Sequence, residues 1–480
     1  MFFAVILLFT AAIIFGAACI NAIRMKRKNP PFAAYKGDDA VNAKYAKDLS
    51  KMIQVPTIND GSIDPYEIHS NFNKFHELLK ALFPLCHSEM ERVDLQTDAL
   101  LFRLKGADSS KGAIVLMAHQ DVVPADGLWK HDPFSGDIDD SRVWGRGAVD
   151  TKGSLCAIFE ALESLIAEGF TPSRDIYISS SNNEETMGDG AARAVNYFKK
   201  NGIPVEIVSD EGGAIIESPM PGLSGHYAML GIVEKGIANV KFTARSSGGH
   251  ASAPPKNSPI AKLSAFVSDI DKRPPFESKL SEPLCQMFEA LAPSMSFPYR
   301  FLFGNLWLFG PIIKLAMPAI SSQANAMLRT TCAFTMAQGS KAANVMPETA
   351  SVTANVRFIM HQPREESLDL LKEASVKHGL EMEVLYSHDC SPYVDIGSSQ
   401  YQYVEDCLSK TFPNAGIAPY IMIGGTDSRH FSEICKCVVR CSPIIMDSQQ
   451  LNSMHAADEN VYIDSIAQAV DFYRLMIKEA

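Results

Sequence analysis

The sequence predicts an α/β fold with a mostly parallel main sheet that helices cover on both faces. Three short apolar runs, at residues 112–119, 174–181 and 205–210, alternate with helical stretches at residues 154–169 and 191–202. Strands joined by crossover helices pair in parallel, and such sheets are buried on both faces. Polar side chains follow each run directly. In open sheets of this kind ligands bind beyond the carboxyl ends of the strands, so we expect the functional site there.

Length and composition indicate an ordinary globular protein with more than one domain. The chain has 480 residues, of which 46% are hydrophobic and 21% are charged, and a chain of this length usually divides into domains. The formal net charge is −11, and the only notable basic run is residues 24–28. Proteins that bind nucleic acid cluster Lys and Arg on one surface. We therefore expect no nucleic-acid partner.

The N-terminal segment is apolar enough to enter a membrane. Residues 2–23 carry no charge, and a helix crosses a bilayer with about 20 residues. The basic cluster follows this run, and by the positive-inside rule it would remain on the cytoplasmic side. We expect residues 1–28 to form a membrane anchor. A cleaved signal segment, which would release a secreted protein, is the alternative, and the side of the membrane stays open.

The main domain is expected in two parts, residues 40–236 and 393–480. Residues 40–85 repeat apolar positions every three or four residues, which is typical of helices. The alternating strands and helices follow. After the insertion, residues 399–412, 417–431 and a final helix from Ile463 return to the same α/β pattern. The ten cysteines suggest no disulfide framework, so we expect mostly buried free thiols.

The pattern changes after Gly236. Residues 238–246 and 351–360 alternate apolar and polar side chains, as half-exposed antiparallel strands do, and residues 381–389 read as another strand. We expect a separate α+β domain at residues 237–392, inserted as a lid or dimerisation domain. Its unusually apolar stretch at residues 276–323 is expected to form a core or a dimer contact. The alternative is an acyl pocket beside the site, lined by Trp307 and Phe309.

A set of histidines and carboxylates marks the ends of the predicted strands. They are His119, Asp121, Asp150, Glu184, Glu185, Asp210 and His455. Imidazole and carboxylate ligands suit zinc, cobalt or manganese, and the lack of cysteine argues against a closed structural zinc site. Each motif alone is weak evidence for a metal site. A Glu-Glu pair, for example, most often lies on a solvated helix face. Together they suit two divalent ions with one bridging carboxylate and one unligated base.

In their order along the chain, these motifs resemble the aminoacylase, carboxypeptidase S and glutamate carboxypeptidase family of dizinc metallopeptidases. The resemblance runs from about residue 45 to the C-terminus. Residues 303–309 and 328–347 are most similar to carboxypeptidase S and the secreted N-acyl amino acid hydrolases. The resemblance implies two zinc ions per subunit, with cobalt or manganese as substitutes. His119 and Asp210 would bind one ion, Glu185 and His455 the other, and Asp150 would bridge them.

The resemblance also assigns the groups around the metals. Glu184 would be the general base, and Asp121 would orient His119 by accepting its second ring N–H. Glu211 and Asp458 are surplus carboxylates outside this set. The family further implies a cis peptide bond between Asp150 and Thr151.

Five more residues are implied as substrate-binding. His250 would reach the active site of the partner subunit in a homodimer, and Asn344 would hold the substrate. Arg357 would pair with a free carboxylate, which its planar guanidinium suits. Gly425 and Thr426 belong to a glycine-rich loop beside the substrate.

The predicted function is hydrolysis of an amide bond next to a free α-carboxylate, in a peptide or an N-acyl amino acid. One alternative is a non-catalytic dimeric scaffold of the same fold, which the loss of a ligand or the base would have favoured. Another is an aminopeptidase with the same metal site, against which Arg357 argues.

Overall fold

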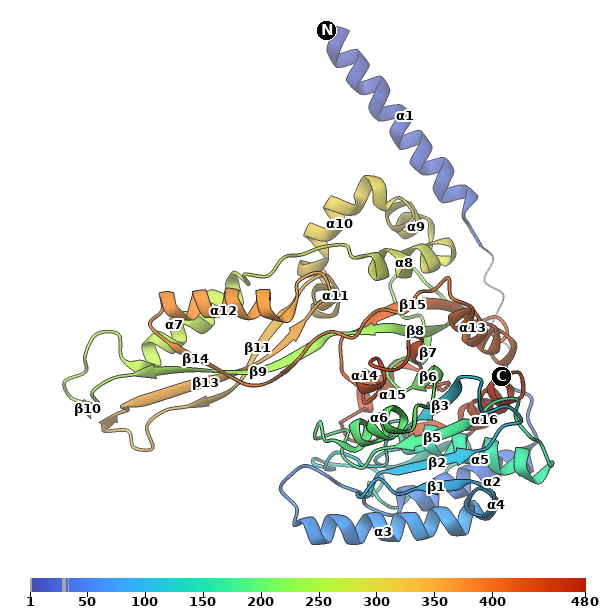
Figure 1. The fold of residues 1–480 in the computed structure, drawn as a ribbon. Helices are drawn as coiled ribbons and strands as arrows, with labels where there is room; N and C mark the ends of the chain where they lie inside the picture. The colour runs from blue at the N-terminus through green and yellow to red at the C-terminus, as the bar shows by residue number, and fades with distance from the viewer. Residues whose placement is uncertain (1, 28–31, 33) are drawn as a thin grey trace.

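The computed structural model describes residues 2–27, 32 and 34–480. Figure 1 shows a main body of helices and strands, an arm of long strands that leaves it on one side, and a helix that projects away from it. Met1 and Lys28, at the ends of the predicted anchor, lie outside the described residues.

The main body is built on a ten-stranded sheet with a parallel centre. The parallel central strands are β5 (Ile176–Ser180), β3 (Ala113–Met117), β6 (Val205–Asp210) and β16 (Val438–Arg440). One flank is antiparallel and consists of β2 (Leu100–Leu104) and β1 (Glu91–Val93). The other flank is mixed and consists of β8 (His226–Glu234), β15 (Gly416–Met422), β7 (Ile215–Glu217) and β17 (Ile445–Met446). The predicted fold class is confirmed.

Helices cover both faces of this sheet, as the side chains of β3 show. Ile114 and Leu116 pack into one apolar core, which includes α5 (Lys152–Ala167) and α16 (Ile463–Lys478). Val115, between them, packs into a second core with α6 (Gly190–Asn201). Successive side chains of a strand point to opposite faces, so the two cores lie on opposite sides of the sheet.

The body also contains the helices before β1 and after the arm, and one small antiparallel ribbon. The predicted helical stretch forms α2 (Asp39–Ile53), α3 (Pro65–Leu82) and α4 (Pro84–Glu89). The side chains of Asp38 and Asp64 cap α2 and α3 by accepting backbone N–H groups of the first turn. The later elements are α13 (Ser399–Thr411), α14 (Ser428–Phe431), α15 (Ser448–Ser453) and the antiparallel pair β4 (Arg142–Trp144) and β18 (Asn460–Tyr462). All ten cysteines are free, and most are buried.

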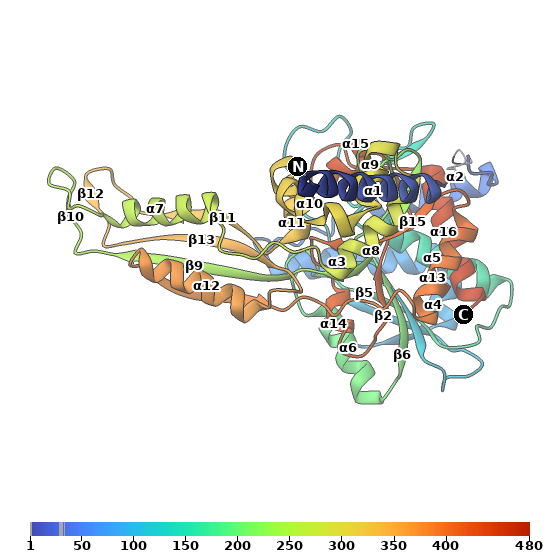
Figure 2. The same ribbon diagram turned by 90° about the horizontal axis from the view of Figure 1, so that it is seen from above.

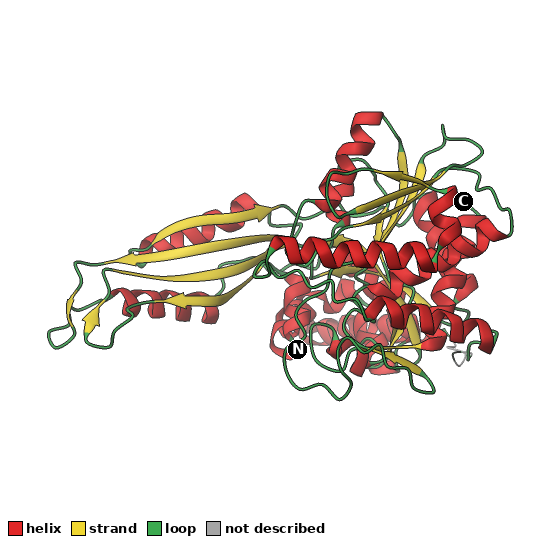
Figure 3. Cartoon of the chain, turned by 90° about the horizontal axis from the view of Figure 1, so that it is seen from below, coloured by secondary structure: helices red, strands yellow, loops and turns green. Residues whose placement is uncertain are grey.

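The arm is an antiparallel sheet in the order β11 (Thr331–Gln338), β13 (Thr349–Phe358), β9 (Gly236–Arg245) and β14 (Glu381–His388). Alternate residues of β9, such as Val240 and Phe242, pack with α7 (Pro259–Lys272) and α12 (Arg364–Lys377) in a core of their own. The strands run from the body to the far end of the arm (Figure 3), where β10 (Gly249–His250) pairs with β12 (Val345–Met346).

The predicted inserted domain does not pack as one unit. Its middle part forms α8 (Glu282–Leu291), the short 3-10 helix η1 (Ala292–Ser294), α9 (Phe297–Phe303), α10 (Leu306–Ile320) and α11 (Ser322–Leu328). Leu284 and Phe288 of α8 belong to the core of the main body, and α8 lies against β15. The stretch 237–392 therefore supplies both the arm and a helical layer on the body. Beside α9 runs α1 (Phe2–Arg24) (Figure 2).

Candidate metal centre

Three parallel strands bring histidine and carboxylate side chains to one edge of the sheet. His119 follows β3, Glu184 and Glu185 follow β5, and Glu211 follows β6 directly. The carboxyl ends of parallel strands meet at one edge, so loops far apart in the sequence converge there. Asp150 joins them from the turn before α5.

Asp150 lies between two histidines and faces each with a different oxygen. Its Oδ1 is 3.0 Å from Nε2 of His119, and its Oδ2 is 3.0 Å from Nε2 of His455. Glu185 Oε2 lies 3.2 Å from the same nitrogen of His455. This is the arrangement that a carboxylate bridging two cations requires. The Asp150–Thr151 peptide is cis, as the resemblance implied.

The structure differs from the prediction at Asp210. This residue ends β6, and its carboxylate accepts the backbone N–H of Ser428 at 2.9 Å. Glu211, which the sequence analysis left aside, takes the place beside His119, with Oε1 3.5 Å from Nε2. The possible ligand atoms of His119, Glu184 and Glu211 lie within 4.8 Å of one another. Glu211 is therefore the carboxylate that joins His119 at this end of the cluster.

The donor set and its hydrogen bonding fit divalent cations. Glu185 Oε1 is buried and has no hydrogen-bond partner among the described residues. Burial and neighbouring carboxylates raise the pKa of Glu184 and of Glu211. Hydrogen bonds to Asp150 and Glu185 raise the pKa of His455 to about 10. A pocket with so much crowded negative charge is stabilised by bound cations, and imidazole with carboxylate suits zinc.

Asp121 holds the loop of the predicted base. Its carboxylate accepts the backbone N–H of Glu184 at 3.2 Å and that of Glu185 at 3.0 Å. The ring Nδ1 of His119 donates to the backbone carbonyl of Asp121 at 2.9 Å, while the carboxylate is 3.4 Å away. The predicted orientation of His119 by Asp121 is thus made through the backbone, and it leaves Nε2 facing the cluster.

Glu459 is a residue that the sequence analysis missed. It is fully buried, and its Oε1 accepts the backbone N–H groups of Val149 at 2.8 Å and Asp150 at 3.1 Å. Its Oε2 accepts from Arg146 Nη1 at 2.8 Å. Glu459 therefore fixes the loop that carries the bridging aspartate. Its neighbour Asp458 instead accepts the backbone N–H of Lys130 at 2.7 Å, outside the cluster.

Arg357 and the glycine-rich loop meet where the arm joins the body. A Cβ on Gly425 would lie 3.7 Å from both Arg357 Nη1 and Glu234 Oε1. The Thr426 hydroxyl donates to Glu234 Oε2 at 3.0 Å. Burial lowers the pKa of Arg357, and the negative charges of Glu234 and Glu184 act in the opposite direction. The structure thus places a guanidinium within electrostatic reach of the predicted base.

His250 and Asn344 lie away from this centre within one chain. Both are exposed at the far end of the arm, where β10 and β12 pair (Figure 1). His250 Nδ1 is 2.7 Å from the Ser252 hydroxyl, and the Asn344 carbonyl accepts the Ala251 N–H at 3.0 Å. These two predicted residues are close to each other but not to the metal cluster.

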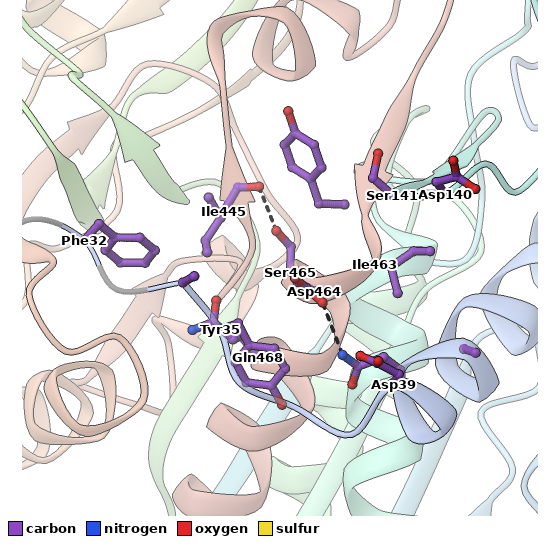
Figure 4. Close-up of a pocket in the computed structure, with 14 residues that line it drawn as sticks. Phe32, Tyr35, Asp39, Asp140, Ser141, Ile445, Ile463, Asp464, Ser465 and Gln468 are labelled. Carbon is purple, nitrogen blue, oxygen red and sulfur yellow. Dashed lines mark hydrogen bonds between the residues drawn. The ribbon is translucent and has the colours of Figure 1, made fainter.

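A separate cavity of about 570 Å³ lies between the segment after α1 and the start of α16 (Figure 4). Phe32, Tyr35 and Gln468 line it, and Asp464 there accepts a hydrogen bond from Asn42 at 3.2 Å. None of the cluster residues lines this cavity.

Comparisons with known proteins identify the family of the chain. Residues 115–479 match the model of the peptidase family M20/M25/M40. The chain is 35% identical over 475 residues to the probable carboxypeptidase S-like 2 of Dictyostelium discoideum, covering 96% of this chain and 90% of that protein. It is 31% identical over 438 residues to the N-fatty-acyl-amino acid synthase/hydrolase PM20D1 of Homo sapiens, covering 90% and 87%. The predicted resemblance to these two groups is confirmed.

Solved structures share the fold at low sequence identity. The M20 family metallo-carboxypeptidase Sso-CP2 from Sulfolobus solfataricus superposes with a TM-score of 0.64 at 17% identity, covering 92% of this chain and 99% of that one. Human carnosine dipeptidase 1 gives a TM-score of 0.62 at 15% identity, covering 92% and 97%. The protein is a hydrolytic enzyme with a cluster of metal-compatible side chains, and by family and fold the chain belongs to the M20/M25/M40 peptidases.

Proposed function

We propose that the enzyme hydrolyses an amide bond whose amine side is an amino acid with a free α-carboxylate, using two zinc ions. The main support for this proposal is the position of Asp150. One of its carboxylate oxygens faces His119 and the other faces His455. Names of relatives, a carboxypeptidase S-like protein and an N-fatty-acyl-amino acid synthase/hydrolase, support both substrate classes.

Each cluster residue has a role in this proposal. His119 and Glu211 would hold one ion, His455 and Glu185 would hold the other, and Asp150, which lies between the two histidines, would be the shared ligand. Glu211 thus replaces Asp210 in the assignment made from the sequence. Bound divalent cations would supply Lewis acidity toward the scissile carbonyl and the attacking water. Cobalt or manganese would suit the same ligands.

Glu184 is left free of a metal to move the proton. It removes a proton from the attacking water and delivers it to the leaving amine. Arg357, with Gly425 and Thr426 beside it, binds the free carboxylate and thereby selects substrates that carry one.

The proposal includes a homodimer and a membrane anchor. His250 and Asn344 lie at the end of the arm and would complete the site of the partner subunit. The helix α1 is long and apolar enough to cross a bilayer, and Arg24, Lys26 and Arg27 follow its apolar run. The alternative is that α1 is a signal segment, whose removal would yield a secreted enzyme.

Product analysis with the purified full chain tests this function. The chain is supplied with zinc, cobalt or manganese and offered dipeptides and N-acyl amino acids. The same compounds with the α-carboxylate replaced by a carboxamide, the amino acid amides, are offered for comparison. We expect release of a free amino acid from substrates with a carboxylate, and loss of turnover by ~10²–10⁴-fold in Glu184→Gln with both metals retained. Cleavage that prefers the amides would indicate an aminopeptidase instead. An absence of turnover in both proteins would favour a binding scaffold.

A further inference from the structure

The outward face of α10 is apolar and exposed. Trp307, Ile312 and Leu315 are 64%, 61% and 82% exposed, and Ile320, which ends the helix, is 77% exposed. Pro311 and Ala319 share this side of the helix, and Lys314 is the one charged residue of α10. The opposite side, with Ile313 and Met317, is buried in the core of the main body. Large exposed apolar patches of this kind mark interaction surfaces.

The helix α9 extends this surface. Phe297, Tyr299 and Leu302 are 44%, 38% and 37% exposed. The axes of α9 and α10 form an angle of 99°, so the two helices make a bent pair at the surface of the body rather than one straight span. We refer to the exposed residues of α9 and α10 as the α9–α10 surface.

The helix α1 is joined to this surface by specific contacts. Asn305, which is fully buried, donates from Nδ2 to the carbonyl of Ala18 at 3.1 Å. Asn21 donates in return to the carbonyl of Gly304 at 2.9 Å. The rings of Phe15 and Phe301 lie 5.3 Å apart. Paired amide hydrogen bonds fix the position of α1 along its axis relative to α9 and α10.

These contacts give the depth at which the surface lies relative to the apolar run of α1. The run ends at Ile23, and Arg24 follows it. Ala18 is five residues before Ile23, which corresponds to about 8 Å along a helix that rises about 1.5 Å per residue. Helices that lie in a membrane interface bury their apolar face to a depth of about 5–10 Å. The contact at Ala18 falls within that range.

The segment after α1 marks the polar boundary of the same layer. The Arg27 N–H donates to the carbonyl of Pro293, in η1 just before α9, at 2.9 Å. Arg24, Lys26 and Arg27 therefore lie at the edge of the α9–α10 surface, where they would meet lipid phosphate groups. Cations at this level and aromatic residues just inside it are typical of membrane interfaces.

We propose that the α9–α10 surface is embedded in the lipid leaflet at the basic end of α1, so that the enzyme contacts the bilayer through α1, α9 and α10 together. This inference rests on the proposed retention of α1 as an anchor. The occupant of the surface is lipid acyl chain, with Lys314 extending its amine toward the headgroups. A second copy of the chain, the predicted dimer contact, is the other occupant that the test distinguishes.

The fluorescence of Trp307 tests the proposal directly. The full chain and the Trp307→Phe variant are reconstituted in vesicles of phosphatidylcholine and phosphatidylserine, with and without bromine on the acyl chains. Bromine quenches indole at close range, and the difference between the two proteins isolates Trp307 from Trp129 and Trp144. We expect most of the Trp307 emission to be quenched. Leu315→Asp should restore a large part of it.

Val376→Asp is the matched control, because Val376 is 65% exposed on α12 of the arm, away from this surface. It should leave Trp307 quenched. Hydrolysis of a water-soluble substrate should be unchanged in both aspartate variants, which verifies their folding and keeps this test separate from the proposed reaction.

Unquenched Trp307 overturns the inference in every case. If the protein nevertheless stays with the vesicles after alkaline extraction, α1 is an anchor and only the embedding of α9 and α10 is wrong. If Leu315→Asp also splits a dimer in analytical ultracentrifugation, the surface is a subunit contact.

Discussion

Arg146 and Glu459 lie 313 residues apart in the sequence and meet inside the main body, where Arg146 Nη1 is 2.8 Å from Glu459 Oε2. Both side chains are buried, at 2% and 0% exposure. Since Glu459 also accepts the N–H groups of Val149 and Asp150, this ion pair ties the C-terminal part of the body to the loop of the bridging carboxylate.

Glu459→Gln is expected to weaken both the fold and the metal centre. The variant leaves the Arg146 charge buried without its partner, and breaking a buried pair in this way costs about 3–5 kcal/mol. Loss of a group that orients a ligand lowers metal affinity by about 10–100-fold. Urea unfolding and metal content after dialysis against a chelator measure the two effects. Asp458→Asn is the control, and equal behaviour of the two variants would contradict the role of Glu459.

The choice between Asp210 and Glu211 can be made by counting metal ions. We expect Glu211→Gln to lose the ion beside His119. Asp210→Asn should keep both ions, because an asparagine oxygen can still accept the Ser428 N–H. Elemental analysis of the purified variants gives the ratio of metal to protein. The opposite result would restore the assignment of Asp210 made from the sequence.

Complementation tests whether His250 acts across a dimer. Glu184→Gln and His250→Ala are each expected to be inactive alone. When they are mixed, a heterodimer would contain one site with both residues intact, so part of the activity should return. Mass spectrometry of the mixture verifies that heterodimers form. Heterodimers without activity would remove His250 from the partner site.

The sequence predicted the sheet and most of the cluster because both depend on local patterns. Apolar runs gave β3, β5 and β6, and the polar residues after them converge wherever parallel strands end. The same logic cannot separate Asp210 from Glu211. Adjacent residues at a strand end point to opposite sides, and the last residue of the strand decides which carboxylate faces His119.

Two other features depend on contacts that no local pattern records. Glu459 meets Arg146 only in the folded protein, because most of the chain lies between the two residues in the sequence. The apolar periodicity of α8 indicates a buried face but not the surface that covers it, and α8 packs on β15 of the body rather than on the arm. The period-two pattern of residues 238–246 and 351–360, by contrast, was enough to predict the antiparallel sheet of the arm.

Lys235 is expected to make the stability of the protein depend on pH. It is 1% exposed, its Nζ donates to the carbonyls of Ala326 and Arg329 at 2.9 Å each, and burial lowers its pKa to about 7. An unfolded lysine keeps its ordinary pKa near 10.4. Between these values the unfolded state binds more protons, so the free energy of unfolding should rise with pH, by at most about 1.4 kcal/mol per pH unit.

Lys235→Met isolates this contribution, because it keeps an unbranched apolar chain without a titrating group. Urea unfolding is measured for both proteins at several pH values between about 7 and 10, a window set by the two pKa values. The unfolding free energy of the wild type minus that of Lys235→Met should therefore increase as the pH rises. Parallel curves would show that Lys235 does not titrate in this window.

Arg357 is expected to select substrates that carry a free carboxylate. Its Nε donates to Asn355 Oδ1 at 2.9 Å, which orients the guanidinium beside Gly425. Lysine preserves the charge but cannot hold a carboxylate with two parallel N–H groups. A hydrogen bond to a charged group contributes about 1.5–3 kcal/mol, so Arg357→Lys should lower kcat/KM for carboxylate substrates by roughly 10–150-fold. Because the carboxylate does not react, most of the loss should appear in KM.

Slow turnover of the amino acid amides should stay unchanged, and Arg245→Lys, an exposed arginine on the arm, should match the wild type. If Arg357→Lys slows both substrate classes equally, the arginine supports the site without recognising the carboxylate.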